Sequence, residues 1–390
     1  MGLEYVPREL EGHLEQLATW FPIVSVTGPR QSGKSTLIRN TFPSFEYVNL
    51  EDPTTRVAAA EDPVGFLHAH PAPLVIDEAQ RAPDLFSALQ VASDERGTPG
   101  QYVLSGSQNF LMSRRISQSL AGRVGTTTLL PFSYREALRA RPELTADAFA
   151  HSGGYPRLVM TGMPASVYHA SYVDTYVERD VAGELDVRNL ATFRTFLALC
   201  AQRVGGILNT SELARDAGVS FPTAKSWLSI LQASGIVHLL PAWASNEGKR
   251  LIKAPKLYLL DTGLLCHLLR ITSPEDLLAS EHLGAVVENL VVAETLKYHM
   301  HRGVRPELFY YRDDSKCEID LLDVTDATSR RAIEVKAGET YRERFSTQLA
   351  RVGAGLGFEP ERRVVVYRGR ETFQTRACRV VSLGEFLVGA

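Results

Sequence analysis

The stretch from Gly28 to Thr36 constrains the fold of this chain more than any other. It reads Gly-Pro-Arg-Gln-Ser-Gly-Lys-Ser-Thr, which matches the phosphate-binding pattern G-x-x-x-x-G-K-[ST]. The apolar run at 23–26 predicts a strand before it, and residues 36–39 predict the opening of a helix. In that order, loop N–H groups and the helix N-terminus surround an anion with positive partial charge. The sequence therefore predicts a nucleotide phosphate site, and a chance glycine-rich turn is the alternative.

The positions of this loop have separate expected roles. Gly28 and Gly33 can adopt backbone angles that other residues resist, so the loop can curl around phosphate. We expect Lys34 to reach the β- and γ-phosphates and the Ser35 hydroxyl to bind Mg²⁺. The predicted ATP-binding residues are Gly28, Pro29, Arg30, Gln31, Ser32, Gly33, Lys34, Ser35 and Thr36, with Asp77 and Ser107 from later segments.

An apolar run at 74–76 ends in two acids, Asp77 and Glu78. Such a run is typical of a parallel strand that is buried on both faces. Asp77 would then emerge at the carboxyl end of the strand, beside the phosphate loop, where it can hold Mg²⁺. We expect Glu78 to polarise the attacking water. The alternative is a strand that simply ends in two solvated acids.

The next predicted strand, 102–105, leads into a polar tip at 106–109. Ser107 or Asn109 could touch the γ-phosphate or its water, although polar loop tips without a role are also common. Enzymes that hydrolyse a nucleotide bound at such a phosphate loop often need an arginine from a neighbouring subunit, which offsets charge on the transferred phosphoryl group. Arg123 is the preferred candidate over Arg114 and Arg115, and an ordinary surface arginine is the alternative.

A helix–turn–helix pattern follows a mostly helical stretch at 131–176. Residues 209–214, capped by Thr210 or Ser211, and 221–233 predict two helices, and two short strands come next. This order is that of a winged helix. If it binds duplex DNA, polar side chains of the second helix face a groove and a basic wing meets phosphate. These residues are Ser220, Thr223, Lys225 and Ser226 on the helix and Lys249, Arg250, Lys253 and Lys256 in the wing. A protein-contact module with the same fold is the alternative.

Near the end of the chain, carboxylates occur on a predicted helix, on a hairpin strand and on the strand that follows it. Glu288 lies in a predicted helix at 284–298, and Asp320 lies on the returning strand of a hairpin. Glu334 and Lys336 are two apart on the next strand, so they share a face. This is the core pattern of PD-(D/E)xK nucleases, in which Glu288, Asp320 and Glu334 would bind Mg²⁺ and Lys336 would orient the water. A solvent face of mixed charge is the alternative.

Composition bears on the cellular compartment and on general nucleic-acid affinity more than on the specific function. The net charge of −3 provides no general attraction to nucleic acid, so DNA binding requires a local basic patch. The four cysteines are scattered, which favours neither a zinc site nor disulfides and leads us to expect a cytoplasmic protein. Residues 1–16 lack an apolar signal core, and no stretch approaches the ~18 apolar residues that span a bilayer.

Taken together, these motifs resemble the bacterial and archaeal AAA-type ATPases that carry a C-terminal domain of unknown function related to PD-(D/E)xK nucleases. The matching stretches are 26–36, 76–80, 105–108, 119–123, 255–258, 261–264, 287–289, 318–320 and 333–336. The resemblance implies ATP binding and hydrolysis with Mg²⁺ and assembly into a homo-oligomer that could be a ring. Ser35 departs from the more usual threonine, but both residues supply a hydroxyl.

The expected fold is α/β and has four parts. These are a P-loop NTPase core of AAA type at 1–135, a helical lid at 136–195, a winged helix-turn-helix at 196–272 and a restriction-endonuclease-like domain at 280–390. The expected function is an Mg²⁺-dependent ATPase coupled to DNA binding or processing. One alternative is an ATP-gated switch or scaffold whose winged helix and inactive nuclease-like domain bind partner proteins. Another is a DNA-binding regulator whose ATP state sets its oligomeric form. The expected catalytic residues are Lys34, Glu78 and Arg123 for ATP, and Asp320, Glu334 and Lys336 for DNA.

Overall fold

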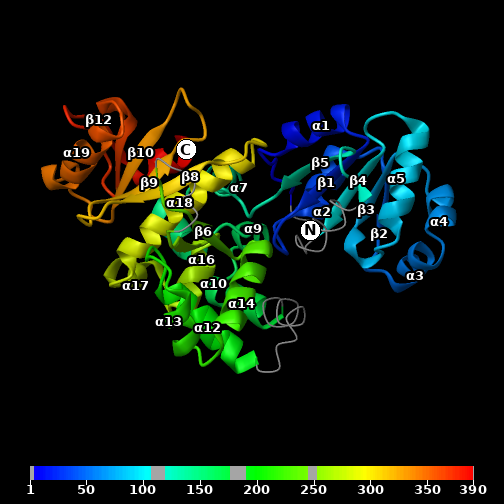
Figure 1. The fold of residues 1–390 in the computed structure, drawn as a ribbon, viewed down its shortest axis with the longest axis horizontal. Helices are drawn as coiled ribbons and strands as arrows, with labels where there is room; N and C mark the ends of the chain where they lie inside the picture. Colours follow the sequence, from blue (N-terminus) through cyan, green and yellow to red (C-terminus); the bar gives the residue numbers. More distant parts are fainter. Residues whose placement is uncertain (1–3, 107–118, 176–189, 245–252, 390) are drawn as a thin grey trace. The chain divides into compact units, whose positions relative to one another are not determined.

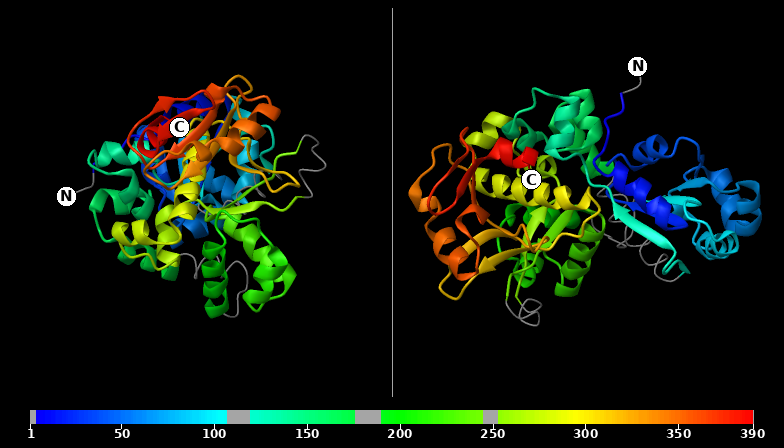
Figure 2. Two further views of the ribbon diagram at one scale, coloured as in Figure 1. Left: turned by 90° about the vertical axis from the view of Figure 1, so that its left-hand side faces the viewer. Right: turned by 90° about the horizontal axis from the view of Figure 1, so that it is seen from above.

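The computed structural model describes residues 4–106, 119–175, 190–244 and 253–389. The chain forms two compact units, which can be followed by colour in Figures 1 and 2. The first unit comprises residues 1–131 with 233–235 and 300–304, and the second comprises 132–232, 236–299 and 305–390. The division into four parts expected from the sequence stays a prediction.

A five-stranded sheet forms the centre of the first unit. Its strand order is β2-β3-β4-β1-β5, and every neighbouring pair is parallel. The strands are β1 Ile23–Thr27, β2 Glu46–Asn49, β3 Leu74–Asp77, β4 Tyr102–Gly106 and β5 Val124–Thr128. All residues of β1, β3 and β4 are buried, as the apolar runs predicted. The α/β fold with a parallel sheet is therefore confirmed.

Helices of the first unit pack on both faces of this sheet. They are α1 Glu11–Trp20, α2 Lys34–Thr41, α3 Pro53–Glu61, α4 Pro63–Ala69, the 3₁₀ turn η1 Ala79–Arg81 and α5 Leu85–Arg96. Neighbouring residues of β1 belong to different cores, since Ile23 packs with Phe86 of α5 and Val24 packs with Leu37 of α2. Between β3 and β4 the chain forms η1 and then α5 as separate elements, because Pro83 cannot continue a helix begun before it.

The second unit begins with helices and a two-stranded hairpin. Its helices are α7 Tyr134–Ala140, α8 Ala146–Ser152, α9 Pro156–Thr161, α10 Ala165–Tyr172, α12 Leu190–Gln202, α13 Thr210–Asp216, α14 Phe221–Ala233, α16 Thr262–Leu268 and α17 Pro274–Ala279. Strands β6 Val237–Leu240 and β7 Lys256–Leu259 pair antiparallel. The cap of α13 is Asn209, whose side chain accepts the Glu212 N–H at 3.2 Å, and not Thr210 or Ser211.

A six-stranded mixed sheet forms the last part of the second unit, with the order β12-β13-β11-β10-β9-β8. Its strands are β8 Leu308–Arg312, β9 Glu318–Asp323, β10 Arg331–Lys336, β11 Arg363–Tyr367, β12 Phe373–Gln374 and β13 Arg379–Ser382. The accompanying helices are α18 Leu283–Met300, α19 Thr347–Gly355 and α20 Leu383–Gly389, with 3₁₀ turns η3 Glu343–Phe345 and η4 Pro360–Arg362. β9 and β10 are antiparallel neighbours, so the carboxylates of Asp320 and Glu334 come from adjacent strands.

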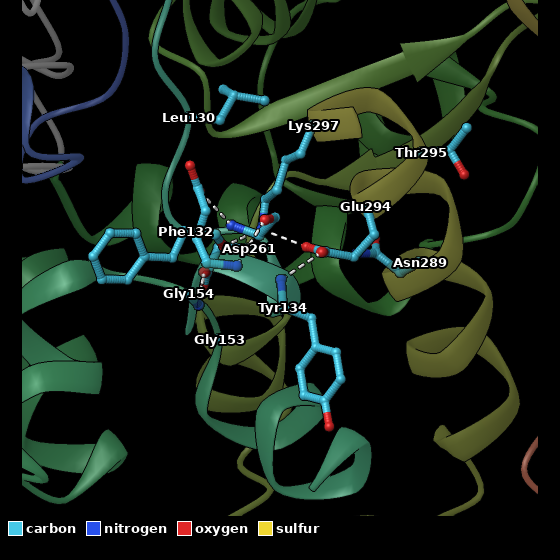
Figure 3. A network of polar contacts seen from close by, with 12 residues as sticks. Leu130, Phe132, Tyr134, Gly153, Gly154, Asp261, Asn289, Glu294, Thr295 and Lys297 are labelled. Carbon is cyan, nitrogen blue, oxygen red and sulfur yellow. Dashed lines mark hydrogen bonds and ion pairs between the residues drawn. The ribbon is translucent and has the colours of Figure 1, made fainter. Parts of the chain in front are cut away.

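Buried charges on α18 fix this helix within the second unit (Figure 3). The Lys297 ammonium donates to the Glu294 carboxylate at 2.7 Å and to the Phe132 carbonyl at 3.0 Å. The second Glu294 oxygen accepts the Tyr134 N–H at 2.7 Å. Both charged side chains are 2% exposed. A charge buried this deeply needs such partners, so the network specifies where α18 packs.

No helix in the described ranges is both long and apolar enough to cross a membrane.

Candidate functional site

The loop between β1 and α2 has backbone conformations that require glycine at two positions. Gly28 has φ +142°, and a Cβ there would lie 2.1 Å from the Leu129 carbonyl oxygen. Gly33 has φ +95° and directly precedes α2. A side chain at either position is therefore strained. The loop ends at the N-terminus of an eight-residue helix, as a phosphate site requires.

Lys34 lies under this loop and is 6% exposed. Its ammonium donates to the carbonyls of Gly28 at 3.0 Å and Pro29 at 2.9 Å. Burial lowers the pKa of Lys34 to about 8, and the charges of Glu78 and Asp77 partly counter this shift. The ammonium is thus held against the loop by two backbone carbonyls that phosphate oxygens could replace.

The Asp77 carboxylate accepts hydrogen bonds from hydroxyl groups on three elements, α2, β2 and β4. The Ser35 Oγ donates to the Asp77 carboxylate at 2.6 Å, and the hydroxyls of Tyr47 and Ser105 also donate to it. β4 lies between β1 and β3, which explains why Ser105, near the end of β4, reaches Asp77. Ser35 and Asp77 are therefore brought together as expected. Tyr47 and Ser105 were missed, because only the strand order places them here.

Glu78 follows Asp77 in a left-handed conformation, with φ +56°. Its backbone N–H donates to the Asp77 carboxylate at 3.1 Å, and the Gln80 side-chain amide donates to the Glu78 carboxylate. A left-handed glutamate is uncommon and marks a backbone that its surroundings hold in place. The turn orients Glu78 at the same edge of the sheet as the phosphate loop.

Arg123 lies just before β5, and its carbonyl accepts the Ile23 N–H at the start of β1. Because β1 and β5 are parallel, Arg123 is at the opposite end of the sheet from the loop at 28–33. Its guanidinium makes two hydrogen bonds to the Asp94 carboxylate, at 2.6 and 2.8 Å. Arg123 therefore does not face the phosphate loop of its own chain. Ser107, Asn109, Arg114 and Arg115 fall outside the described residues.

A buried arginine that sequence reasoning missed supports the phosphate loop. The Arg8 guanidinium donates to the Ser32 carbonyl at 2.9 Å and to the Leu130 carbonyl at 2.8 Å. Arg8 is 5% exposed, so these carbonyls replace water for its charge. No motif marks this residue, because its partners are backbone atoms far away in the sequence.

The helices α13 and α14 and the hairpin β6–β7 follow the order expected of a winged helix. Ser220 caps α14 and bonds Thr223, and Lys225 and Ser226 are exposed. Lys253 is exposed as well, whereas Lys249 and Arg250 fall outside the described residues. The expectation for Lys256 is wrong, because this residue is 2% exposed and pairs with carboxylates instead of forming a surface wing.

The carboxylates expected to form a nuclease site do gather in the second unit. The Val335 N–H donates to Asp320 at 2.8 Å, and the Lys336 ammonium donates to Glu334 at 2.6 Å. Burial, and then the neighbouring charge of Asp320, raise the pKa of Glu334 to about 8 and that of Glu288 to about 7. The second Glu334 oxygen is buried and has no hydrogen-bond partner among the described residues.

The two candidate metal sites differ in how well they fit a cation. A serine hydroxyl beside an aspartate at a phosphate loop supplies oxygen ligands of the kind that Mg²⁺ prefers. At the second site, lysines already contact the carboxylates of Glu288 and Glu334. Nowhere in the part of the chain that the structure describes do three or more His, Cys, Asp or Glu residues form an arrangement that could hold a metal. The geometry therefore fits Mg²⁺ at the phosphate loop and does not fit it in the second unit.

Three family descriptions match successive parts of the chain. Residues 21–138 match an AAA domain, residues 145–275 match a domain of unknown function, DUF8612, and residues 283–386 match another, DUF4143. The first match and the loop geometry identify an AAA-type P-loop ATPase domain. The other two descriptions name no activity.

Two solved structures show a low level of similarity to this chain. The Walker-type ATPase paby2304 of Pyrococcus abyssi is 15% identical, with a TM-score of 0.44 over 67% of this chain and 95% of that one. AMPPCP-bound DnaA from Aquifex aeolicus is 13% identical, with a TM-score of 0.30 over 57% of this chain and 85% of that one.

Sequence relatives extend over nearly the whole chain. The uncharacterized protein Rv2008c of Mycobacterium tuberculosis and Mb2031c of Mycobacterium bovis are each 32% identical over 375 residues, which is 94% of this chain and 81% of theirs. An uncharacterized protein of Haemophilus influenzae is 23% identical over 66% of this chain and 72% of its own length. With its N-terminal AAA-type ATPase domain, the chain belongs to the same protein family as Rv2008c and Mb2031c.

Proposed function

We propose that this protein is an Mg²⁺-dependent ATPase that couples ATP hydrolysis to DNA binding or processing by its second unit. The observation that carries the ATPase half is the 2.6 Å hydrogen bond between Ser35 and Asp77. It joins the hydroxyl after the phosphate-loop lysine to the acid that ends β3. Bound Mg²⁺ would neutralise charge on the β- and γ-phosphates at this point.

Each residue of the site has a distinct part in this proposal. The backbone from Gly28 to Thr36 cradles the phosphates, and Lys34 exchanges loop carbonyls for phosphate oxygens. Glu78 orients the attacking water, and Ser107 contacts the γ-phosphate or that water. Arg123 acts on the nucleotide of a neighbouring copy, so the active form is a homo-oligomer, in our proposal a ring.

The DNA half of the proposal is supported by two features of the second unit. The elements α13, α14, β6 and β7 have the order of a winged helix and expose Lys225 and Ser226. Asp320, Glu334 and Lys336 lie on β9 and β10 in the pattern of a PD-(D/E)xK nuclease, with Glu288 nearby on α18. Because the observed arrangement does not fit Mg²⁺, an active nuclease would first have to free these carboxylates from their lysine partners, and Lys336 would then orient the water.

The second candidate is an ATP-gated switch or scaffold, in which the same second unit binds partner proteins. The specific observation that favours it is the pairing of Glu288 with Lys256. This lysine neutralises a carboxylate that an active nuclease would use for metal. In this case the nuclease-like domain is a contact platform without chemistry.

Three experiments separate the halves of the proposal. Lys34→Ala should abolish binding of a fluorescent ATP analogue, and unchanged affinity would contradict the assigned phosphate loop. Duplex binding by the full chain should weaken steeply as salt rises, because phosphate contacts release counterions. Cleavage is measured by incubating wild type and Asp320→Ala with linear, nicked or single-stranded DNA. Each reaction contains Mg²⁺ or Mn²⁺ and is run with and without ATP. No DNA affinity and no cleavage, with ATP turnover intact, would select the scaffold.

A further inference from the structure

Lys256, the first residue of β7, places a buried ammonium among the carboxylates of the second unit. Its Nζ lies 3.0 Å from the Glu288 carboxylate and 2.5 Å from the Glu318 carboxylate. The hydroxyl of Tyr258, from the same strand, donates to the same Glu288 oxygen at 2.6 Å. Lys256 is 2% exposed, so these acids replace the water that would otherwise solvate its charge.

This contact joins two segments that match different domain families. Lys256 belongs to the segment 145–275, whereas Glu288 and Glu318 belong to the segment 283–386. The hairpin β6–β7 therefore completes the charge balance of the acidic cluster formed by Glu288, Glu318, Asp320 and Glu334. A C-terminal domain considered alone lacks this cation.

The formal charges of the cluster nearly balance without any metal ion. When all are ionised, its four carboxylates face three cations, Lys256, Lys336 and Arg312, whose guanidinium lies 3.7 Å from Glu318, so at most one negative charge is left. A divalent cation added to this set would make it positive. It would also lie within a few ångströms of an ammonium, and like charges at that distance repel strongly in a protein interior.

We propose that Lys256 is the resident cation of this acidic cluster and keeps divalent metal ions out of it while β7 is in place. This inference rests on the nuclease-like site of the proposed function and specifies how that site is regulated.

The test measures metal binding directly and does not use DNA cleavage. Mn²⁺ is titrated into the nucleotide-free full chain, and free Mn²⁺ is followed by electron paramagnetic resonance. Lys256→Met should bind one Mn²⁺ more tightly than wild type by a factor of more than about 100, because a nearby positive charge is removed. Adding Asp320→Asn to this variant should abolish the new site. Lys253→Met, which removes an exposed lysine of the same hairpin, is the matched control and should behave as wild type.

Equal Mn²⁺ affinity in wild type and Lys256→Met, whether both bind or neither does, would overturn the proposal. If Lys256→Met does not fold, wild type and Asp320→Asn still decide the matter. Identical Mn²⁺ titrations of these two proteins support a cluster closed to metal. Mn²⁺ binding by wild type that Asp320→Asn removes overturns the proposal but leaves a metal-dependent nuclease standing.

Discussion

Removal of the Lys297 charge should destabilise the second unit far more than removal of an exposed charge. Lys297→Met removes the 2.7 Å ion pair to Glu294 and the 3.0 Å hydrogen bond to the Phe132 carbonyl. Breaking one side of a buried ion pair costs about 3–5 kcal/mol, because the remaining charge stays buried. Glu294→Gln combined with Lys297→Met should be less harmful than Lys297→Met alone, because it removes that charge.

Urea unfolding followed by tryptophan fluorescence measures this effect. Two of the three tryptophans, Trp227 and Trp243, belong to the second unit, so its transition can be followed. Arg194→Met is the matched control, since Arg194 and Asp174 form an ion pair with exposed side chains. Such pairs contribute about 0–1 kcal/mol. A loss below about 1 kcal/mol for Lys297→Met, equal to that of the control, would refute our reading of the buried network.

Three further predictions concern ATP and DNA. Since burial lowers the pKa of Lys34 to about 8 in the nucleotide-free protein, the ammonium that binds phosphate is lost as pH rises through that value. The Kd for ATP should therefore increase about tenfold per pH unit above this pKa, with proton uptake on binding. Calorimetry in buffers with different ionisation enthalpies checks this, and a binding enthalpy independent of the buffer would contradict it. Arg123→Ala should keep ATP binding but lose about 10³-fold in turnover. Mixing it with Lys34→Ala chains should restore part of the activity, and no recovery in mixed oligomers would argue against action in trans. Lys225→Ala should weaken duplex binding similarly for unrelated sequences and reduce the salt-dependence slope by about 1. An unchanged slope would place the DNA contact elsewhere.

The sequence predicted the parts of the ATPase site that are local. The glycines of the phosphate loop and the acids after β3 are recognisable because each motif combines a turn, a charge and a neighbouring apolar strand. Ser105 and Tyr47 reach Asp77 only through the strand order β2-β3-β4-β1. That order depends on tertiary packing, which no short motif records.

Lys256 is a residue whose environment the sequence predicted wrongly, again because tertiary packing decides it. Its place in a basic stretch predicted a solvated wing, but β7 is buried and brings the ammonium to Glu288 and Glu318. The spacing of Glu334 and Lys336 correctly predicted that they share a face, and they form an ion pair. The cation that balances the remaining carboxylates is Lys256, which lies about sixty residues before Asp320 in the sequence, so no local motif could identify it.

The rate of Mg²⁺-dependent ATP hydrolysis by wild type, Glu78→Gln and Glu61→Gln tests the central claim most directly. Glu61 is an exposed acid at the end of α3, so its variant controls for loss of a carboxylate in the same unit. We predict that wild type and Glu61→Gln release phosphate at equal rates. Glu78→Gln should still bind ATP but turn over about 10²–10⁴-fold more slowly, as expected when a base that positions water is lost. Hydrolysis by Glu78→Gln at the wild-type rate would contradict the account.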